Sequence, residues 1–135
     1  MATAFVSVSY AHYRALSAEL DAIAAVLSAH GITARIFVRD YAFAPEDTRA
    51  MMAAALHDLR TADLLIAEVT HKAIGVGIEV GMAAALDKPI LYVRHRDSEP
   101  STTVGGLAAA AITYRDAADL RTQLSETMAR GLTPR

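Results

Sequence analysis

Hydrophobic positions along the chain fall into two patterns: short continuous apolar runs, and longer stretches in which apolar residues recur at helical spacing. The run over residues 63–69 is almost wholly apolar, which is typical of a strand buried on both faces of a sheet. The runs predict strands over residues 4–8, 33–38, 63–69, 89–93 and 110–114, and the periodic stretches predict helices over residues 14–30, 45–61, 76–86 and 116–130. Residues 40–45 and 94–106 are predicted loops, and residues 133–135 a frayed tail.

Strands that alternate with helices are typical of a parallel sheet joined by right-handed crossovers. We therefore expect a single flavodoxin-like, or Rossmann-like, α/β domain over residues 1–135, a three-layer sandwich around a five-stranded parallel sheet. The expected strand order is 2-1-3-4-5, which places the switch point between the first and third strands. Ligands bind at that point in such folds, so the loops after these two strands should carry the site.

Glu79 is the strongest candidate in those loops. It follows a turn punctuated by Gly75 and Gly77, and the pattern places it in the first turn of the helix over residues 76–86. The positive end of the helix dipole favours an ionised carboxylate there, which suits a nucleophile better than a proton donor. A glycine turn is by itself a weak signal, and a structural charge at a helix start explains the same residues.

Composition narrows the class of protein. The chain has 135 residues, a net charge of −2 and no cysteine, so we expect no nucleic-acid or membrane partner, no disulfide and no thiolate chemistry. No apolar run approaches ~20 residues, and the first ten residues lack the pattern of a signal peptide, so we expect a cytoplasmic protein. We expect no cofactor, and no metal because the histidines lack the close spacing of a ligand pair; they are His12, His30, His57, His71 and His95.

The block from Ala62 to Val93 reads ADLLIAEVTHKAIGVGIEVGMAAALDKPILYV. It resembles the nucleoside 2-deoxyribosyltransferase-like superfamily, and within it most of all the 2′-deoxynucleoside 5′-phosphate N-hydrolase branch. The resemblance implies an enzyme that cleaves or transfers across the N-glycosidic bond of a (deoxy)nucleoside or its 5′-monophosphate, with Glu79 as the nucleophile that attacks the anomeric carbon. It also implies a homodimer or higher homo-oligomer, because the family uses the loop after the fourth strand to reach a neighbouring subunit's site.

Four positions depart from the family pattern. Ala55 stands where the family has a catalytic Asp, Ala73 where Ser or Asp is common, and Ile78 where an aromatic residue or Met is common. The segment 7–9 lacks the glycine of the first loop. Asp58, one helical turn after Ala55, can substitute for the missing acid, although the pattern favours the simpler interpretation of an exposed helix carboxylate.

Other candidates lie at the ends of the first three predicted strands. Ser7 and Ser9 are candidate substrate ligands, and Tyr10 can orient the nucleophile or simply cap the sheet edge. Glu68 lies within an apolar strand and needs a partner, which is either a ligand or a buried ion pair. A carboxylate with two aromatic rings follows the second strand and suits a flat base, although a structural loop explains it too; the residues are Asp40, Tyr41 and Phe43.

The predicted loop after the fourth strand is rich in hydroxyl groups. Ser101, Thr102 and Thr103 can surround a phosphate or a sugar hydroxyl, and Arg94 and Arg96 add positive charge nearby. An ordinary polar loop explains the same composition.

Two other classes of function stay open. The chain can be a non-catalytic nucleotide-binding or signalling module that has lost the family's acid. It can also be a TIR-like domain, which shares a Phe-Val-Ser first strand and a helix-borne glutamate and which cleaves NAD or mediates assembly. The Gly-Val-Gly-Ile-Glu segment favours the deoxyribosyltransferase branch over a TIR-like domain.

Overall fold

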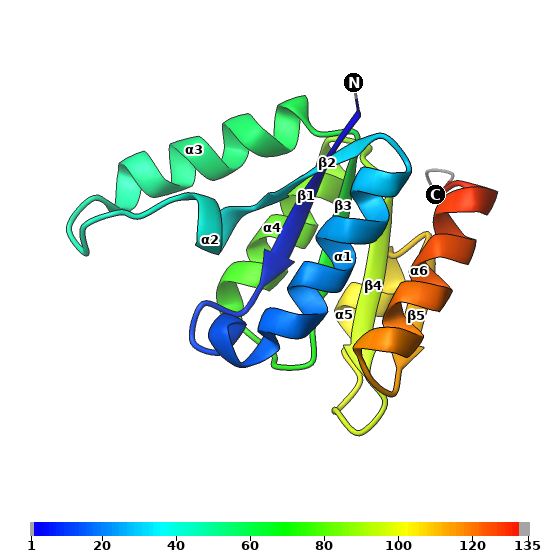
Figure 1. Ribbon diagram of the computed structural model, residues 1–135. Helices are drawn as coiled ribbons and strands as arrows, with labels where there is room; N and C mark the ends of the chain where they lie inside the picture. The colour runs from blue at the N-terminus through cyan, green and yellow to red at the C-terminus, as the bar shows by residue number, and fades with distance from the viewer. Residues whose placement is uncertain (1, 133–135) are drawn as a thin grey trace.

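A five-stranded parallel sheet in the order β2-β1-β3-β4-β5 forms the centre of the computed structural model, which describes residues 2–132 (Figure 1). The predicted α/β fold and strand order are confirmed. Every residue of the central strand is buried, as its apolar run predicts. The strands are β1 Ala2–Val8, β2 Ile32–Ile36, β3 Leu64–Glu68, β4 Ile90–His95 and β5 Ala110–Tyr114.

Helices cover both faces of the sheet. One face is covered by α1 and α6, which pack against each other in front of the strands in Figure 1, and the other by α4, α5 and the end of α3. The helices are α1 Ser17–Ala29, α2 Phe37–Asp40, α3 Thr48–Thr61, α4 Ile74–Ala85, α5 Thr102–Leu107 and α6 Ala117–Arg130, and a 3-10 helix, η1 Tyr13–Leu16, precedes α1.

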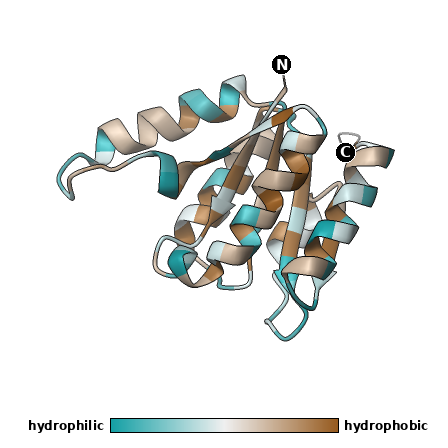
Figure 2. Cartoon of the chain, viewed as in Figure 1, coloured by the Kyte–Doolittle hydropathy of each residue, from teal (hydrophilic) through white to brown (hydrophobic). Residues whose placement is uncertain are grey.

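The core has two layers because side chains alternate between the faces of a strand. Val6 and Ile66 pack beneath α1 and α6, whereas Phe5 and Leu65 pack beneath α3 and α4. Figure 2 shows the resulting hydropathy, with apolar strands at the centre and polar stretches on the outer sides of the helices. The position of a residue along a strand therefore decides which layer, and which site, its side chain can reach.

Several predicted boundaries are wrong, and local hydrogen bonds explain two of the differences. β2 ends at Ile36, where the Asp40 carboxylate accepts a hydrogen bond from the Ile36 N–H at 3.1 Å and the chain turns into α2. α3 begins at Thr48 because Pro45 lies in a turn that the Asp47 N–H closes onto the Ala44 carbonyl at 2.9 Å. The predicted loop 94–106 contains α5, and the predicted tail 133–135 lies outside the described residues.

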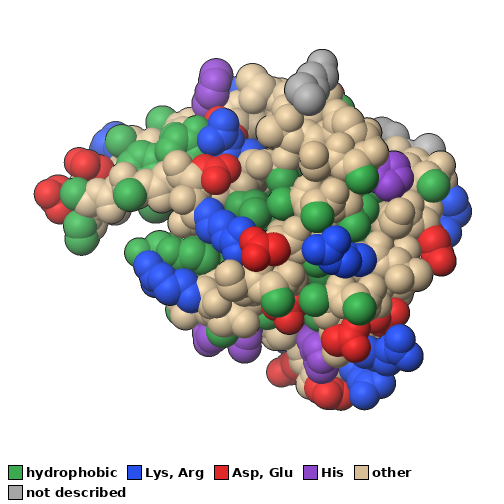
Figure 3. Space-filling view, in the orientation of Figure 1, with side chains coloured by type: hydrophobic (Ala, Val, Ile, Leu, Met, Phe, Trp, Pro, Cys, Tyr) green, Lys and Arg blue, Asp and Glu red, His purple; other side chains and the backbone are tan. Residues whose placement is uncertain are grey.

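Basic and acidic side chains are interspersed on the face that Figure 3 shows, so this face carries no large patch of like charge. No helix within residues 2–132 is long and apolar enough to cross a membrane.

The beginning of α3 projects from the body of the molecule, and α4 exposes Ile74 and Ile78. The homo-oligomer implied by the family resemblance stays a prediction.

Candidate functional site

Glu79 and Ser7 meet at the switch point between β1 and β3. Ser7 is almost fully buried on β1, and its hydroxyl donates a hydrogen bond to Oε1 of Glu79 at 2.5 Å. The alternation of the strand directs Ser7 to the face that α4 covers. Because α4 follows β3 and packs over β1 as well, a residue of its second turn reaches the end of β1.

The structure corrects the predicted position of Glu79 within its helix. α4 begins at Ile74, so Glu79 is its sixth residue and lies in the second turn; Gly75 and Gly77 lie inside the helix and form no separate turn. The helix starts early because the Gly77 N–H already bonds to the Ala73 carbonyl at 3.2 Å. The dipole acts mainly within the first turn, so it does little to ionise this carboxylate.

Burial sets the protonation of Glu79 instead. Desolvation raises the pKa of this carboxyl from its ordinary value of 4.5 to about 7, and the hydrogen bond from Ser7 opposes part of that rise. The group therefore exchanges its proton near neutral pH. A carboxyl with such a pKa at a ligand-binding edge is typical of a functional residue.

Tyr10 does not hold Glu79, as the sequence suggested it could. Its side chain is 70% exposed and its ring packs against Tyr13, and the hydrogen bond to Glu79 comes from Ser7. Ser9, which is buried, instead bonds through its hydroxyl to Nδ1 of His12 at 2.9 Å.

Glu68 lies on the opposite face of the sheet from Glu79, so the two carboxylates do not share a pocket. Its Oε1 accepts the Thr70 N–H at 2.8 Å, and its Oε2 accepts the hydroxyls of Thr70 at 2.7 Å and Tyr114 at 2.6 Å. Burial and the neighbouring Glu68 carboxylate raise the pKa of the Tyr114 phenol. The partner that a buried Glu68 needs is thus neither a ligand nor an ion pair but a set of protein hydrogen-bond donors.

The candidates on α2, in the loop after it and on α3 form one cluster around Arg35 of β2, a residue that the sequence analysis missed. Arg35 lies 3.6 Å from Asp40 and 3.7 Å from Asp58, and its guanidinium lies over the ring of Tyr41. A hydrogen bond to Asp58 is the main cause of a raised Tyr41 pKa. Phe43 stacks on Tyr41. No contact described within residues 2–132 joins this cluster to Glu79.

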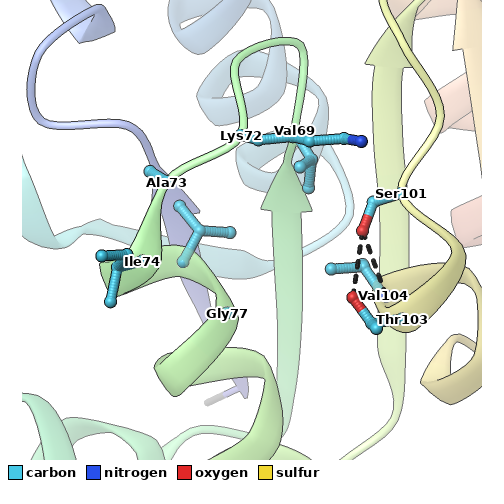
Figure 4. A pocket seen from close by; sticks show the side chains of 9 residues that line it. Val69, Lys72, Ala73, Ile74, Gly77, Ser101, Thr103 and Val104 are labelled. Carbon is cyan, nitrogen blue, oxygen red and sulfur yellow. Dashed lines mark hydrogen bonds between the residues drawn. The ribbon is translucent and has the colours of Figure 1, made fainter.

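A cavity of about 320 Å³ opens at the start of α4, between the loop after β3 and α5 (Figure 4). Ser101 and Thr103 line it, whereas Thr102 is exposed and does not. Ser101 also caps α5, because its hydroxyl accepts the Val104 N–H at 3.3 Å. The positive charge at this cavity comes from Lys72, which the sequence analysis missed and which extends toward Ser101 in Figure 4.

The two predicted arginines do not reach this cavity. Arg94 donates to the backbone carbonyls of His95 at 3.3 Å and Ser98 at 2.8 Å, and Arg96 lies beside Asp97. Among residues 2–132, no three side chains of the metal-binding types gather as a ligand set.

Comparison with known proteins places these features in a family context. The model of the family described as "Nucleoside 2-deoxyribosyltransferase" matches residues 7–125. A protein of Syntrophotalea carbinolica that carries the name "Putative 2'-deoxynucleoside 5'-phosphate N-hydrolase 1" is 36% identical over 83 residues, which are 59% of this chain and 58% of that protein. The 5-hydroxymethyl-dUMP N-hydrolase of Mus musculus is 61% identical over 33 residues, 24% of this chain and 19% of that one.

Among solved structures, the 2-deoxyribosyltransferase of Bacillus psychrosaccharolyticus shares the fold with a TM-score of 0.74 at 14% identity, over 99% of both chains. The matched segments thus span 58% or less of the two sequence relatives, whereas the fold match is nearly complete.

Glu79 should make the protein less stable as pH rises. The folded state holds a proton up to a pKa of about 7, whereas the unfolded chain releases it near 4.5, so the stabilisation is full below the lower value and is lost as pH rises through the higher one. The loss should be about 2–3 kcal/mol in the free energy of unfolding. Urea denaturation at pH 5 and pH 8 measures it, and Glu79→Gln should remove most of the difference; equal pH dependence in both proteins would contradict the assignment.

Glu68 should be essential for stability. Glu68→Ala leaves the Thr70 N–H and two hydroxyls without their buried acceptor, and each unsatisfied group costs about 1–3 kcal/mol. We expect Glu68→Ala to lower the free energy of unfolding by about 3–5 kcal/mol in urea titrations, and Tyr114→Phe, which removes one donor, by about 1 kcal/mol. A Glu68→Ala protein as stable as Tyr114→Phe would show that the cluster is not structural.

Proposed function

Because the chain belongs to the nucleoside 2-deoxyribosyltransferase family, we propose that it cleaves or transfers across the N-glycosidic bond of a (deoxy)nucleoside or its 5′-monophosphate, with Glu79 as the nucleophile. The observation that carries the proposal is the Ser7–Glu79 pair, a carboxyl held by a buried hydroxyl at the edge where this fold binds ligands. The names of the two sequence relatives, both N-hydrolases of nucleotides, support the same chemistry.

The reaction uses the ionised form of Glu79. Ser7 fixes Oε1, and among the described residues no group binds the other carboxylate oxygen, which is left to attack the anomeric carbon. A C–O bond forms as the C–N bond breaks, and the bonding pair leaves with the base, which takes up a proton. Water or a second base then displaces the carboxylate from the same carbon, so the configuration at that carbon is retained.

The cavity beside the start of α4 suits a 5′-phosphate. Lys72 supplies a positive charge there, and Ser101 and Thr103 supply hydroxyls. The ion pair of Lys72 with Glu99 at 3.0 Å is exposed and contributes little, so the ammonium can turn to an anion at small cost. Gly77 lines the same cavity from α4 and leaves its backbone open to close approach.

Glu79→Gln should abolish base release. The amide keeps the size of the side chain but cannot form the glycosyl ester, so we expect the rate to fall by at least about 10³-fold. Chromatography of free base after incubation with nucleosides, 2′-deoxynucleoside 5′-monophosphates and NAD measures the rate. Glu126→Gln, at an exposed position on α6, is the matched control and should be unaffected.

Three outcomes would redirect the proposal. Activity of Glu79→Gln within about tenfold of the parent protein would refute the nucleophile. Cleavage of NAD alone would favour the TIR-like alternative. Micromolar binding of nucleotides without any turnover would favour a binding module, for which the buried alanine at position 55 is the supporting observation, since it lies in an apolar layer where the family carries an acid.

Gly77→Ala should weaken nucleotide binding without harming the fold. An added Cβ at this position meets no protein atom within 4 Å, and alanine is favoured over glycine in a helix by about 0.5–1 kcal/mol, so the variant should melt at the same temperature or higher. The methyl group would nevertheless enter the cavity, and we expect the Kd for a nucleoside monophosphate to rise by about tenfold, or 1.4 kcal/mol.

Gly81→Ala is the control for this variant. Gly81 lies one turn further along α4, also has no atom within 4 Å of an added Cβ, and does not line the cavity. Calorimetric titration of both variants with the same nucleotide separates a ligand clash from a general effect of alanine. Equal affinities in the two variants would show that the nucleotide does not occupy the cavity.

A further inference from the structure

Two histidines that are far apart in the sequence stack at the edge where Glu79 lies. The rings of His12 and His71 are nearly parallel, at 11°, with their centroids 3.8 Å apart. His12 follows β1 and His71 follows β3, and these strands are parallel neighbours, so both loops leave the sheet at the same edge. The strand pairing therefore creates a pair of imidazoles that no spacing in the sequence indicates.

Ser9 sets the position of His12. Its buried hydroxyl bonds to Nδ1 of His12 at 2.9 Å, and a turn in which the His12 N–H bonds to the Ser9 carbonyl at 3.1 Å fixes the backbone. Since Nδ1 is engaged, Nε2 is the ring nitrogen left to bind a ligand. His12 itself is exposed, so its ring is accessible to a ligand.

The loop that carries His12 begins where β1 ends, two residues after Ser7. Ser9 is the first residue beyond β1, and two residues of extended chain rise by about 6–7 Å. A sugar bound at Glu79 with its base directed outward, beyond the end of β1, would point the base toward the loop that carries His12.

The proposed reaction needs a proton donor for the departing base. Position 55 is a buried alanine, and the carboxylates of Asp40 and Asp58 are both engaged with Arg35. Imidazole is the side chain whose ordinary titration range is nearest to neutral pH, which suits it to donate a proton and take one back within a single turnover.

We propose that His12, held by Ser9 and stacked on His71, protonates the leaving base; this inference rests on the proposed function. As the C–N bond breaks, the bonding pair stays on the base nitrogen, which takes the proton from Nε2 of His12. The neutral imidazole then takes a proton from the water whose oxygen attacks the glycosyl ester, and Glu79 leaves as a carboxylate. His71 provides the flat surface that holds the ring of His12 in place.

Dependence on the leaving group tests the proposal. His12→Asn should lower the rate of base release from the natural 2′-deoxynucleoside 5′-monophosphates by about 10²–10⁴-fold, the usual range for loss of a general acid. With 4-nitrophenyl 2-deoxyribofuranoside 5-phosphate, whose leaving group departs without a proton, the rate should fall by less than about threefold. His57→Asn, at an exposed position on α3, is the matched control and should change neither rate.

Variants of the second histidine separate its role from that of the first. His71→Phe keeps an aromatic surface and should retain nearly full activity on the natural nucleotides, whereas His71→Ala should lower it about tenfold by loosening His12. Circular dichroism checks that all variants fold. An equal loss on natural and activated substrates with His12→Asn, or no loss on either, would overturn the proposal, as would a His71→Phe variant as impaired as His12→Asn.

Failure of the proposed function gives a different pattern. If Glu79→Gln cleaves the activated substrate as fast as the parent protein, the nucleophile assignment is wrong. If Glu79→Gln is inactive on both substrates while His12→Asn loses nothing on either, the nucleophile stands and the proton donor assigned to His12 is refuted.

Discussion

The parallel pairing of β1 with β3 is the constraint on which the site depends. Its register sets Ser7 opposite Ala67 and Val8 opposite Glu68, so the two strands end together and their loops leave side by side. The crossover after β3 returns over β1 as α4, which brings Glu79 against Ser7. The same register brings the loop that carries His12 against the loop that carries His71. A shift of one residue in this register would turn the side chains of the shifted strand, such as Ser7 on β1, to the other face of the sheet.

Two carboxyl groups, Glu68 on β3 and Glu79 on α4, lie in contrasting environments. Glu68 is fully buried, and its oxygens accept three hydrogen bonds from Thr70 and Tyr114. Glu79 is partly buried with one donor, Ser7, and desolvation raises its pKa to about 7. The first group is satisfied by the protein alone and joins the loop after β3 to β5. The carboxyl of Glu79 can accept further hydrogen bonds or contacts, which a group that reacts with a ligand requires.

The features at the ligand-binding edge fall into two groups. The first contains the Ser7–Glu79 pair and the histidine pair, and the second contains the cavity with Lys72 and the hydroxyls of Ser101 and Thr103. A nucleotide also has two such parts, since the base and the 5′-phosphate arm are attached to different carbons of the sugar ring. This correspondence, together with membership of the nucleoside 2-deoxyribosyltransferase family, is why we favour a nucleotide over a smaller ligand.

The sequence by itself determined the fold, because alternation of apolar runs with helical stripes is a local property that each segment carries independently. It also indicated Glu79 as a candidate, since the glycines, the glutamate and the preceding strand lie within one short block. It misplaced Glu79 within its helix, because the first residue of a helix depends on which backbone group closes the first turn, here the N–H of Gly77.

Only the tertiary structure decided which candidates belong together. The sequence does not show which face of the sheet Glu68 occupies or which residue Tyr10 contacts. Many residues also separate Arg35 from Asp58 and His12 from His71 along the chain. These relations arise from strand register and from helices packed across neighbouring strands, which are contacts between distant segments. The pKa of Glu79 belongs to the same class of property, because desolvation depends on what the whole chain places around a carboxyl and not on the residues beside it in the sequence.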